Sequence, residues 1–284
     1  MVKKYLRSIR VKNLALLSFI FWGLMLHCYS VDFNFELNHF LLFLSILLTT
    51  ASGYLINNFY DIESDRINEK LVNDLSAQNL IRLYFIHLIL SFIILFTSSL
   101  SAGWILMVMI CHVLVFSYSL LFQKIPLIGN VLVSFLCFIV VVIPQLLIPD
   151  YFYFKNFNIN DNLIITYSVF CFIITLKREI IKDIEDQNGD QKTGNYTIPI
   201  ILGLKFTKVL ISVLVIIELI FMYLVLKQNF LDFKNLFFAF PQIIVLIMAS
   251  LFLYKYSENK QFKKLSNLVK VQFLIAGIWL YITL

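Results

Sequence analysis

Four carboxylates within residues 177–194 have a spacing that could bind a cation. Glu179, Asp183, Asp186 and Asp190 follow one another at i, i+4, i+7 and i+11. At 100° per residue, these positions fall within about 60° of one another on a continuous helix. The segment therefore predicts one acidic stripe along a helix.

A second acidic segment, residues 57–68, repeats this arrangement. Asn57, Asp61 and Asp65 are spaced i, i+4 and i+8, so they also share one face of a helix. Each segment directly follows an apolar run, residues 41–56 in one case and residues 163–176 in the other. We therefore expect both stripes to lie at the edge of a membrane.

Neighbouring carboxylates on one helix face repel each other unless a positive charge lies between them. Mg²⁺ is suited to such a place, because it takes a few carboxylates together with phosphate oxygens of a substrate. The predicted metal ligands are Asn57, Asp61, Asp65, Asp183, Asp186 and Asp190, of which Asp61, Asp65, Asp183 and Asp186 are the predicted catalytic residues. The basic residues near the stripes, Arg66, Lys124, Arg178 and Lys182, would bind a diphosphate, and Arg10 is a further candidate for an anionic group.

The composition indicates the class of protein to which these segments belong. The chain has 284 residues, of which 60% are apolar and 14% are charged, and these values predict a polytopic membrane protein. An open sheet could not satisfy its backbone in hydrocarbon, so we expect an all-α fold in one membrane domain, residues 1–284. Nine spans are predicted at residues 14–30, 41–56, 83–100, 104–122, 131–148, 163–176, 209–226, 236–254 and 269–284.

Basic residues set the expected orientation. With the N-terminus in the cytoplasm, the segments on the cytoplasmic side carry 20 Lys and Arg and the outer segments carry 3. This asymmetry is typical of a multi-pass inner-membrane protein of bacterial type, and it places both acidic segments on the cytoplasmic face. The net charge of +6 follows from this topology, so we expect membrane lipid and no nucleic acid as a partner.

Other kinds of site are disfavoured. The four cysteines form no CxxC pair and the four histidines have no ligand spacing, so a zinc site is not expected. An ion-coupled transporter would place its carboxylates near the bilayer midplane. Glu218 is the one acid clearly inside a predicted span, and we expect it to pair with a tyrosine or to face a cavity.

Three motifs together resemble the UbiA-type intramembrane prenyltransferase superfamily. Asn57, Asn58, Asp61 and Asp65 match its first motif, NDxxDxxxD, apart from Asn58 in place of aspartate. The second motif, DxxDxxxD followed by glycine and T-x-P, is similar to residues 183–199. YSLLFQKIPLIGN, residues 118–130, looks like the family's turn after its fourth helix. REIIKDIEDQNGDQKTG is most similar to geranylgeranylglyceryl-phosphate geranylgeranyltransferases and their bacterial relatives.

Two further positions and one stretch depart from the family pattern. Gln123 stands where a lysine is common, and Val11 replaces a proline that often follows the arginine of the first helix. Residues 69–76, EKLVNDLS, replace a basic, proline-containing stretch that helps to cover the diphosphate in relatives.

The resemblance implies nine helices around a central cavity and a Mg²⁺-dependent transfer of a prenyl group. The donor would be a polyprenyl diphosphate such as geranylgeranyl diphosphate, and the acceptor a lipid-like alcohol such as a prenylated glycerol phosphate. Two alternatives stay open, which are prenylation of an aromatic quinone precursor and a non-catalytic, lipid-binding member of the family.

Overall fold

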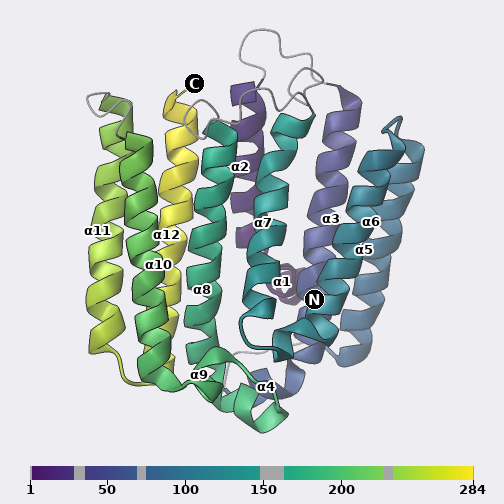
Figure 1. Cartoon of the computed structure of the whole chain (residues 1–284). Helices are drawn as coiled ribbons and strands as arrows, with labels where there is room; N and C mark the ends of the chain where they lie inside the picture. The colour runs from purple at the N-terminus through teal and green to yellow at the C-terminus, as the bar shows by residue number, and fades with distance from the viewer. Residues whose placement is uncertain (1, 29–35, 69–74, 148–162, 227–232, 284) are drawn as a thin grey trace. The chain divides into compact units, whose positions relative to one another are not determined.

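The computed structural model describes residues 2–28, 36–68, 75–147, 163–226 and 233–283. Within these ranges every regular element is a helix, as the sequence predicts (Figure 1). The elements are α1 (Val2–Ser8), α2 (Val11–Cys28), α3 (Leu37–Tyr60), α4 (Ile62–Ile67), α5 (Ala77–Thr97), α6 (Ala102–Leu120), the 3-10 turn η1 (Phe122–Lys124), α7 (Ile128–Leu146), α8 (Leu163–Thr193), α9 (Ile198–Ile201), α10 (Gly203–Leu226), α11 (Phe233–Lys255) and α12 (Asn259–Thr283).

The long helices coincide with the predicted spans, but not every one of them is long and apolar enough to cross a membrane. Across the described ranges, seven helices are long and apolar enough to span a bilayer, or eight if α1 and α2, bent by 58°, count as one broken span. α8 is not among them, since its charged residues Lys177, Arg178 and Glu179 begin only fourteen residues after Leu163. The coarser prediction of a multi-helix, membrane-type fold is confirmed, whereas nine spans stay a prediction.

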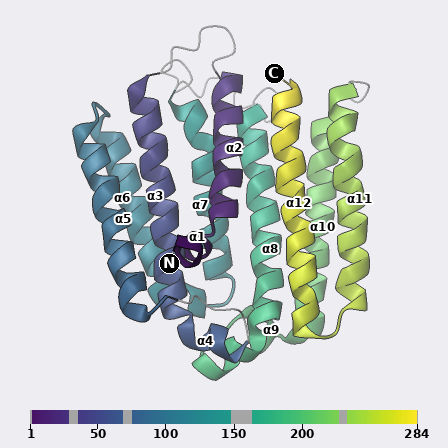
Figure 2. The same ribbon diagram turned by 180° about the vertical axis from the view of Figure 1, so that it is seen from behind.

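The chain forms two compact units, and each draws on separate parts of the sequence. Unit 1 contains residues 1–18, 33–125 and 188–195. In it α5 and α6 lie beside α3 (Figures 1 and 2). The junction of α1 with α3 and α5 is filled by an apolar cluster that includes Ile9, Leu55 and Leu80. Burial of these side chains fixes the end of α3 from which the first acidic segment continues.

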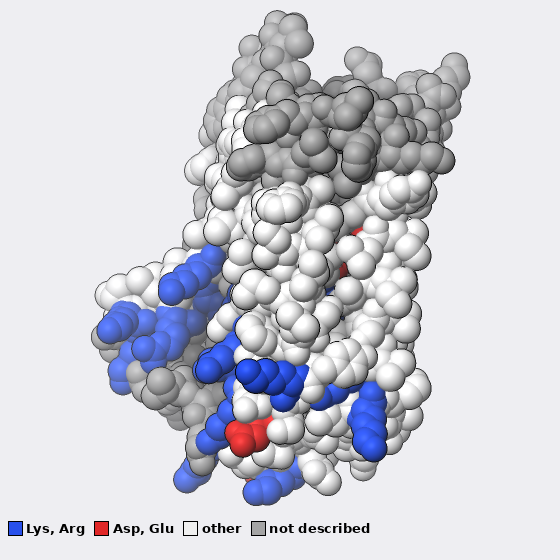
Figure 3. Space-filling model, turned by 90° about the vertical axis from the view of Figure 1, so that its left-hand side faces the viewer, with Lys and Arg blue, Asp and Glu red and all other residues white. Residues whose placement is uncertain are grey.

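Unit 2 contains residues 19–32, 126–187 and 196–284. It holds α7, most of α8, α9 and the helices α10, α11 and α12, which lie side by side. α12 packs against the second half of α2. The Tyr281 hydroxyl donates to the Phe19 carbonyl at 2.8 Å, and the rings of Tyr281 and Phe19 stack with centroids 4.5 Å apart. On the side of α10 and α11, uncharged side chains cover the helices, and Lys and Arg gather at the end where α11 leads into α12 (Figure 3).

Candidate active site

The first acidic segment bridges α3 and α4, and the helix is interrupted at Asp61, whose φ of −88° and ψ of 0° separate the two elements. The Asp61 N–H donates to the Asn57 carbonyl at 2.9 Å, and the Asp65 N–H donates to the Asp61 carbonyl at 2.8 Å. These two i to i+4 hydrogen bonds place Asp61 one turn after Asn57 and Asp65 one turn after Asp61. The predicted continuous helix is therefore divided between α3 and α4, and a single face shared by the three residues stays a prediction.

Two neutral amides hold the Asp61 carboxylate. The Asn57 side-chain amide donates to Asp61 Oδ2, and Gln123 Nε2 donates to Asp61 Oδ1 at 3.2 Å. Sequence reasoning chose Lys124 for this neighbourhood, but Lys124 is exposed at the end of η1. The available signal was Gln123 itself, an amide in the YSLLFQKIPLIGN turn that can donate a hydrogen bond although it lacks the charge of the family's lysine.

Asn58 has a separate role within unit 1. Its side chain is only 5% exposed, and its Nδ2 donates to the Ser8 carbonyl at 2.8 Å. The bond ties α3 to the end of α1. An ionised aspartate has no proton to donate, so the amide at this position satisfies a buried carbonyl that the family's usual aspartate would repel.

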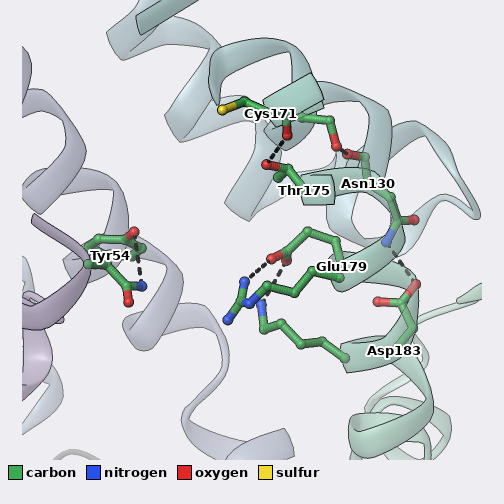
Figure 4. Close-up of polar contacts among 10 residues, drawn as sticks. Tyr54, Asn130, Cys171, Thr175, Glu179 and Asp183 are labelled. Carbon is green, nitrogen blue, oxygen red and sulfur yellow. Dashed lines mark hydrogen bonds and ion pairs between the residues drawn. The ribbon is translucent and has the colours of Figure 1, made fainter. Parts of the chain in front are cut away.

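The second acidic segment lies on one continuous helix, α8, as predicted. Glu179, however, is held in ion pairs. It is 7% exposed, and it accepts from Arg178 Nη1 at 2.5 Å and from Lys182 Nζ at 2.7 Å (Figure 4). Arg178 and Lys182, both predicted to bind a diphosphate, thus share one carboxylate.

Asp183, one turn further along α8, has a neutral partner. Asn130 Nδ2, near the start of α7, donates to Asp183 Oδ2 at 2.9 Å (Figure 4). Asn130 is 8% exposed, and no sequence argument singled it out except as the last residue of the turn motif. An amide donor orients the carboxylate without neutralising its charge. Asp186, on the same helix, is half-buried.

The last turn of α8 belongs to unit 1, where it packs against α4. Ser64 Oγ donates to Asp190 Oδ1 at 3.1 Å, and Asn195 Nδ2 donates to the same oxygen at 3.2 Å. The Gly189 N–H donates to Asn68 Oδ1 at 2.9 Å. A Cβ on Gly189 would lie 2.4 Å from the Ser64 carbonyl oxygen, so this approach requires glycine. The ends of the two sequence motifs therefore meet at α4.

Two further predicted residues, Arg10 and Arg66, lie elsewhere in unit 1. Arg10 adopts a left-handed conformation with φ of 50° at the bend between α1 and α2, and its guanidinium lies 4.9 Å from the centre of the Tyr54 ring. Asn13 Nδ2 donates to the Tyr54 hydroxyl at 3.3 Å (Figure 4). Tyr54 thus positions Arg10 through a cation–π contact. Arg66, in the last turn of α4, is exposed.

The oxygen ligands that both segments offer fit Mg²⁺. In the described parts of the chain, three or more His, Cys, Asp or Glu side chains do not converge on one point. Mg²⁺ does not need such a cage, since it is usually bound by one or two carboxylates and completed by water and phosphate oxygens. Asp61 and Asp183 each accept hydrogen bonds from amides, which orient a carboxylate and carry no charge of their own. Residues 69–74, most of the stretch that replaces the family's basic loop, lie outside the described residues.

Glu218 and Lys177 correct two expectations from the sequence. Glu218 on α10 is fully buried and accepts from Lys177 Nζ of α8 and from Gln272 Nε2 of α12, the latter at 2.6 Å. Its partners are thus a lysine and a glutamine, not a tyrosine. Lys177 is one of the 20 basic residues that the sequence assigns to the cytoplasmic side, yet it is 1% exposed and belongs to this buried network.

Comparison with known proteins agrees with these observations. The sequence model of the UbiA prenyltransferase family matches residues 16–276. The chain is 30% identical over 282 residues to the digeranylgeranylglyceryl phosphate synthase of Methanosphaera stadtmanae, and the alignment covers 96% of both proteins.

Solved structures share the fold. A structure reported for digeranylgeranylglyceryl phosphate synthase in membranes has a TM-score of 0.65 and 25% identity, with 99% of this chain and 97% of that chain covered. A UbiA homolog from Archaeoglobus fulgidus bound to DMAPP and Mg²⁺ has a TM-score of 0.63 and 16% identity, with 98% and 99% covered. The family match spans most of the sequence and includes both acidic segments. The chain belongs to the UbiA prenyltransferase family.

Proposed function

We propose that this prenyltransferase moves a geranylgeranyl group from geranylgeranyl diphosphate to geranylgeranylglyceryl phosphate. One observation carries the proposal, which is the 30% identity over 96% of both chains to a relative named for that product. Arg178 and Lys182 add a physical argument. They bring two positive charges to Glu179 of the second stripe, where they would favour an anionic acceptor over a neutral one.

We further propose that the six residues predicted from the sequence hold Mg²⁺ and that the donor's diphosphate binds through it. These are Asn57, Asp61 and Asp65 in the first segment and Asp183, Asp186 and Asp190 in the second. The amide contacts on Asp61 and Asp183 support this assignment, as does the Archaeoglobus fulgidus homolog bound to DMAPP and Mg²⁺. When bound, the metal neutralises charge on the diphosphate leaving group.

The reaction itself is an electrophilic substitution. The allylic C–O bond of the donor breaks and its electron pair leaves with the diphosphate. The acceptor hydroxyl oxygen attacks the allylic carbon, and the hydroxyl proton is released as the ether bond forms. The chain's own contribution is to orient the carboxylates through Asn57, Gln123 and Asn130, to supply positive charge through Arg10, Arg66, Lys124, Arg178 and Lys182, and to exclude water with apolar helices.

The same proposal includes the membrane arrangement. Nine spans, with the N-terminus and both acidic segments on the cytoplasmic side, are supported by the nine long helices α2, α3, α5, α6, α7, α8, α10, α11 and α12 within the described ranges. They are also supported by the distribution of basic residues along the sequence.

The decisive assay supplies purified protein, Mg²⁺ and geranylgeranyl diphosphate with one acceptor at a time. Geranylgeranylglyceryl phosphate should give a prenylated product by mass spectrometry, with an equal amount of diphosphate released, and removal of Mg²⁺ by a chelator should stop both. Product from 4-hydroxybenzoate or a naphthoate alone would move the protein to the quinone branch. Binding of prenyl diphosphate with no product from any acceptor would instead indicate a lipid-binding member of the family.

A further inference from the structure

A surface groove runs between α10 and α11 in unit 2, and it has no part in the proposed transfer. It measures about 540 Å³ and is lined by Val215, Leu219, Ile243, Leu246, Ile247, Ser250, Leu251 and Tyr254. Leu246 at 2% and Val215 at 9% exposure form its floor, while Leu251 and Tyr254, both more than 60% exposed, form a wall. The groove is therefore an apolar trough that opens outward.

The trough has one polar end. There the Tyr254 hydroxyl and Ser212 Oγ are hydrogen-bonded at 2.9 Å. One turn before Ser212, Lys208 Nζ donates to the Tyr256 carbonyl at 2.6 Å. Lys205, a further turn back along α10, is exposed. Along α10, the cationic residues thus come first, the Ser212 hydroxyl second, and the apolar residues that line the groove last.

Helical spacing shows that this order is built into one face of α10. Lys205, Lys208, Ser212, Val215 and Leu219 lie within about 80° of one another around the helix axis. On α11, Ile243, Ile247, Ser250 and Tyr254 lie within about 60°. From Ile243 to Tyr254 the groove extends about 17 Å, which is close to one leaflet of a hydrocarbon core about 30 Å thick.

We infer that this groove binds one anionic phospholipid, with its phosphate at Lys205 and Lys208 and one acyl chain along the trough. The charge of the two lysines complements a lipid phosphate, and the hydroxyls of Ser212 and Tyr254 lie where a lipid's glycerol and ester groups follow its phosphate. A second copy of the chain fits less well, because it would have to bring matching negative charge to the lysine end.

The test measures lipid retained by the delipidated, full-length protein in detergent, using native mass spectrometry. Phosphatidylglycerol and phosphatidylcholine with identical acyl chains are supplied in equal amounts. Phosphatidylglycerol should be retained about 5- to 30-fold more than phosphatidylcholine, as expected for one or two lysines near a lipid phosphate. Equal retention of both lipids would overturn the proposal, as would retention of glycerol phosphate without chains at the same level.

Two variants and a matched control locate the site. Ser250→Trp fills the trough, and Lys205→Gln with Lys208→Gln removes the charge while keeping a hydrogen-bond donor for Tyr256. Each should reduce the preference for phosphatidylglycerol to about one- to twofold. Ile217→Trp, at a 44% exposed position on the opposite side of α10, should leave it unchanged. If both groove variants keep the full preference for phosphatidylglycerol, the groove is not a lipid site. The same conclusion follows if the chain forms dimers that Ser250→Trp disrupts without any change in bound lipid.

Discussion

Lys177 on α8 forms a salt bridge with Glu218 on α10, and both side chains are almost completely buried, at 1% and 0% exposure. Gln272 of α12 completes the arrangement by accepting from Lys177 at 2.9 Å and donating to Glu218 at 2.6 Å. Gln242 of α11 donates to the Gln272 carbonyl at 2.9 Å. Four helices of unit 2 are thus joined through one charged pair.

Glu218→Leu should strongly destabilise the protein. It leaves the Lys177 ammonium buried without its carboxylate, at an expected loss of about 3–5 kcal/mol. Lys177→Met combined with Glu218→Leu should recover most of that loss, because neither charge then remains buried. The thermal unfolding midpoint of purified protein in detergent measures both effects. Glu63→Gln, at an exposed position in α4, is the control. If Glu218→Leu alone had the same unfolding midpoint as the wild type, the proposed role of the pair would be contradicted.

The local features of this fold could be predicted from the sequence. Apolar runs predicted the long helices, and the spacing of Asp183, Asp186 and Asp190 predicted one stripe, because helical periodicity depends only on neighbouring residues. Lys177 shows the limit of such local signals. It directly follows an apolar run, as a flanking charge would, and its partner lies 41 residues away.

Contacts between distant segments could not be predicted in this way. Asn130 reaches Asp183 across 53 residues, and Gly189 donates to Asn68 across 121 residues. Both contacts depend on how helices pack, and neither leaves a periodic signal in the sequence. Amide donors such as Gln123 are also hard to recognise, because a glutamine adds nothing to a charge pattern and its partner Asp61 lies 62 residues away.

Asp61→Asn and Asp183→Asn should each lower turnover by more than about 100-fold while the protein remains folded. Each change removes one negative charge from a proposed metal ligand and preserves the size of the side chain. Initial rates of diphosphate release at saturating Mg²⁺ measure the effect, and elution on size-exclusion chromatography reports folding. Glu63→Gln again serves as the control, since it removes an exposed carboxylate from the same segment. Near-normal activity in both variants would refute the catalytic assignment.

Gln123→Leu should raise the Mg²⁺ concentration needed for half-maximal activity by about 10- to 100-fold. The leucine removes the hydrogen bond to Asp61 Oδ1 but keeps a side chain of similar size. A Mg²⁺ titration at fixed donor concentration measures the change. Lys124→Gln tests the neighbouring exposed position, where the metal requirement should stay the same. The opposite pattern, with Lys124 controlling the metal requirement, would show that Gln123 does not orient the ligand.

Gly189→Ala should disturb the contact between α4 and the end of α8. The added Cβ would lie 2.4 Å from both Asn68 Nδ2 and the Ser64 carbonyl oxygen, so the two segments must separate. Overpacking of this kind costs about 1–3 kcal/mol. Gly103→Ala is the matched control, because its Cβ would meet nothing closer than Ser101 Oγ at 3.8 Å. Thermal unfolding should distinguish the two variants, and equal midpoints would argue against close packing at Gly189.

The predicted membrane orientation can be tested by labelling single cysteines with a membrane-impermeant maleimide. Asn188→Cys, at an exposed position on α8, should react only from the cytoplasmic side, and Asn156→Cys, which lies outside the described residues, only from the other. The background lacks Cys28, Cys111, Cys137 and Cys171. Because Lys177 is buried, 19 of the 20 basic residues assigned to the cytoplasmic side remain as flanking charges, against 3 outside. That asymmetry still favours the same orientation. Reaction of both cysteines from one side would rule out nine spans, since it requires an even number of crossings between the two positions.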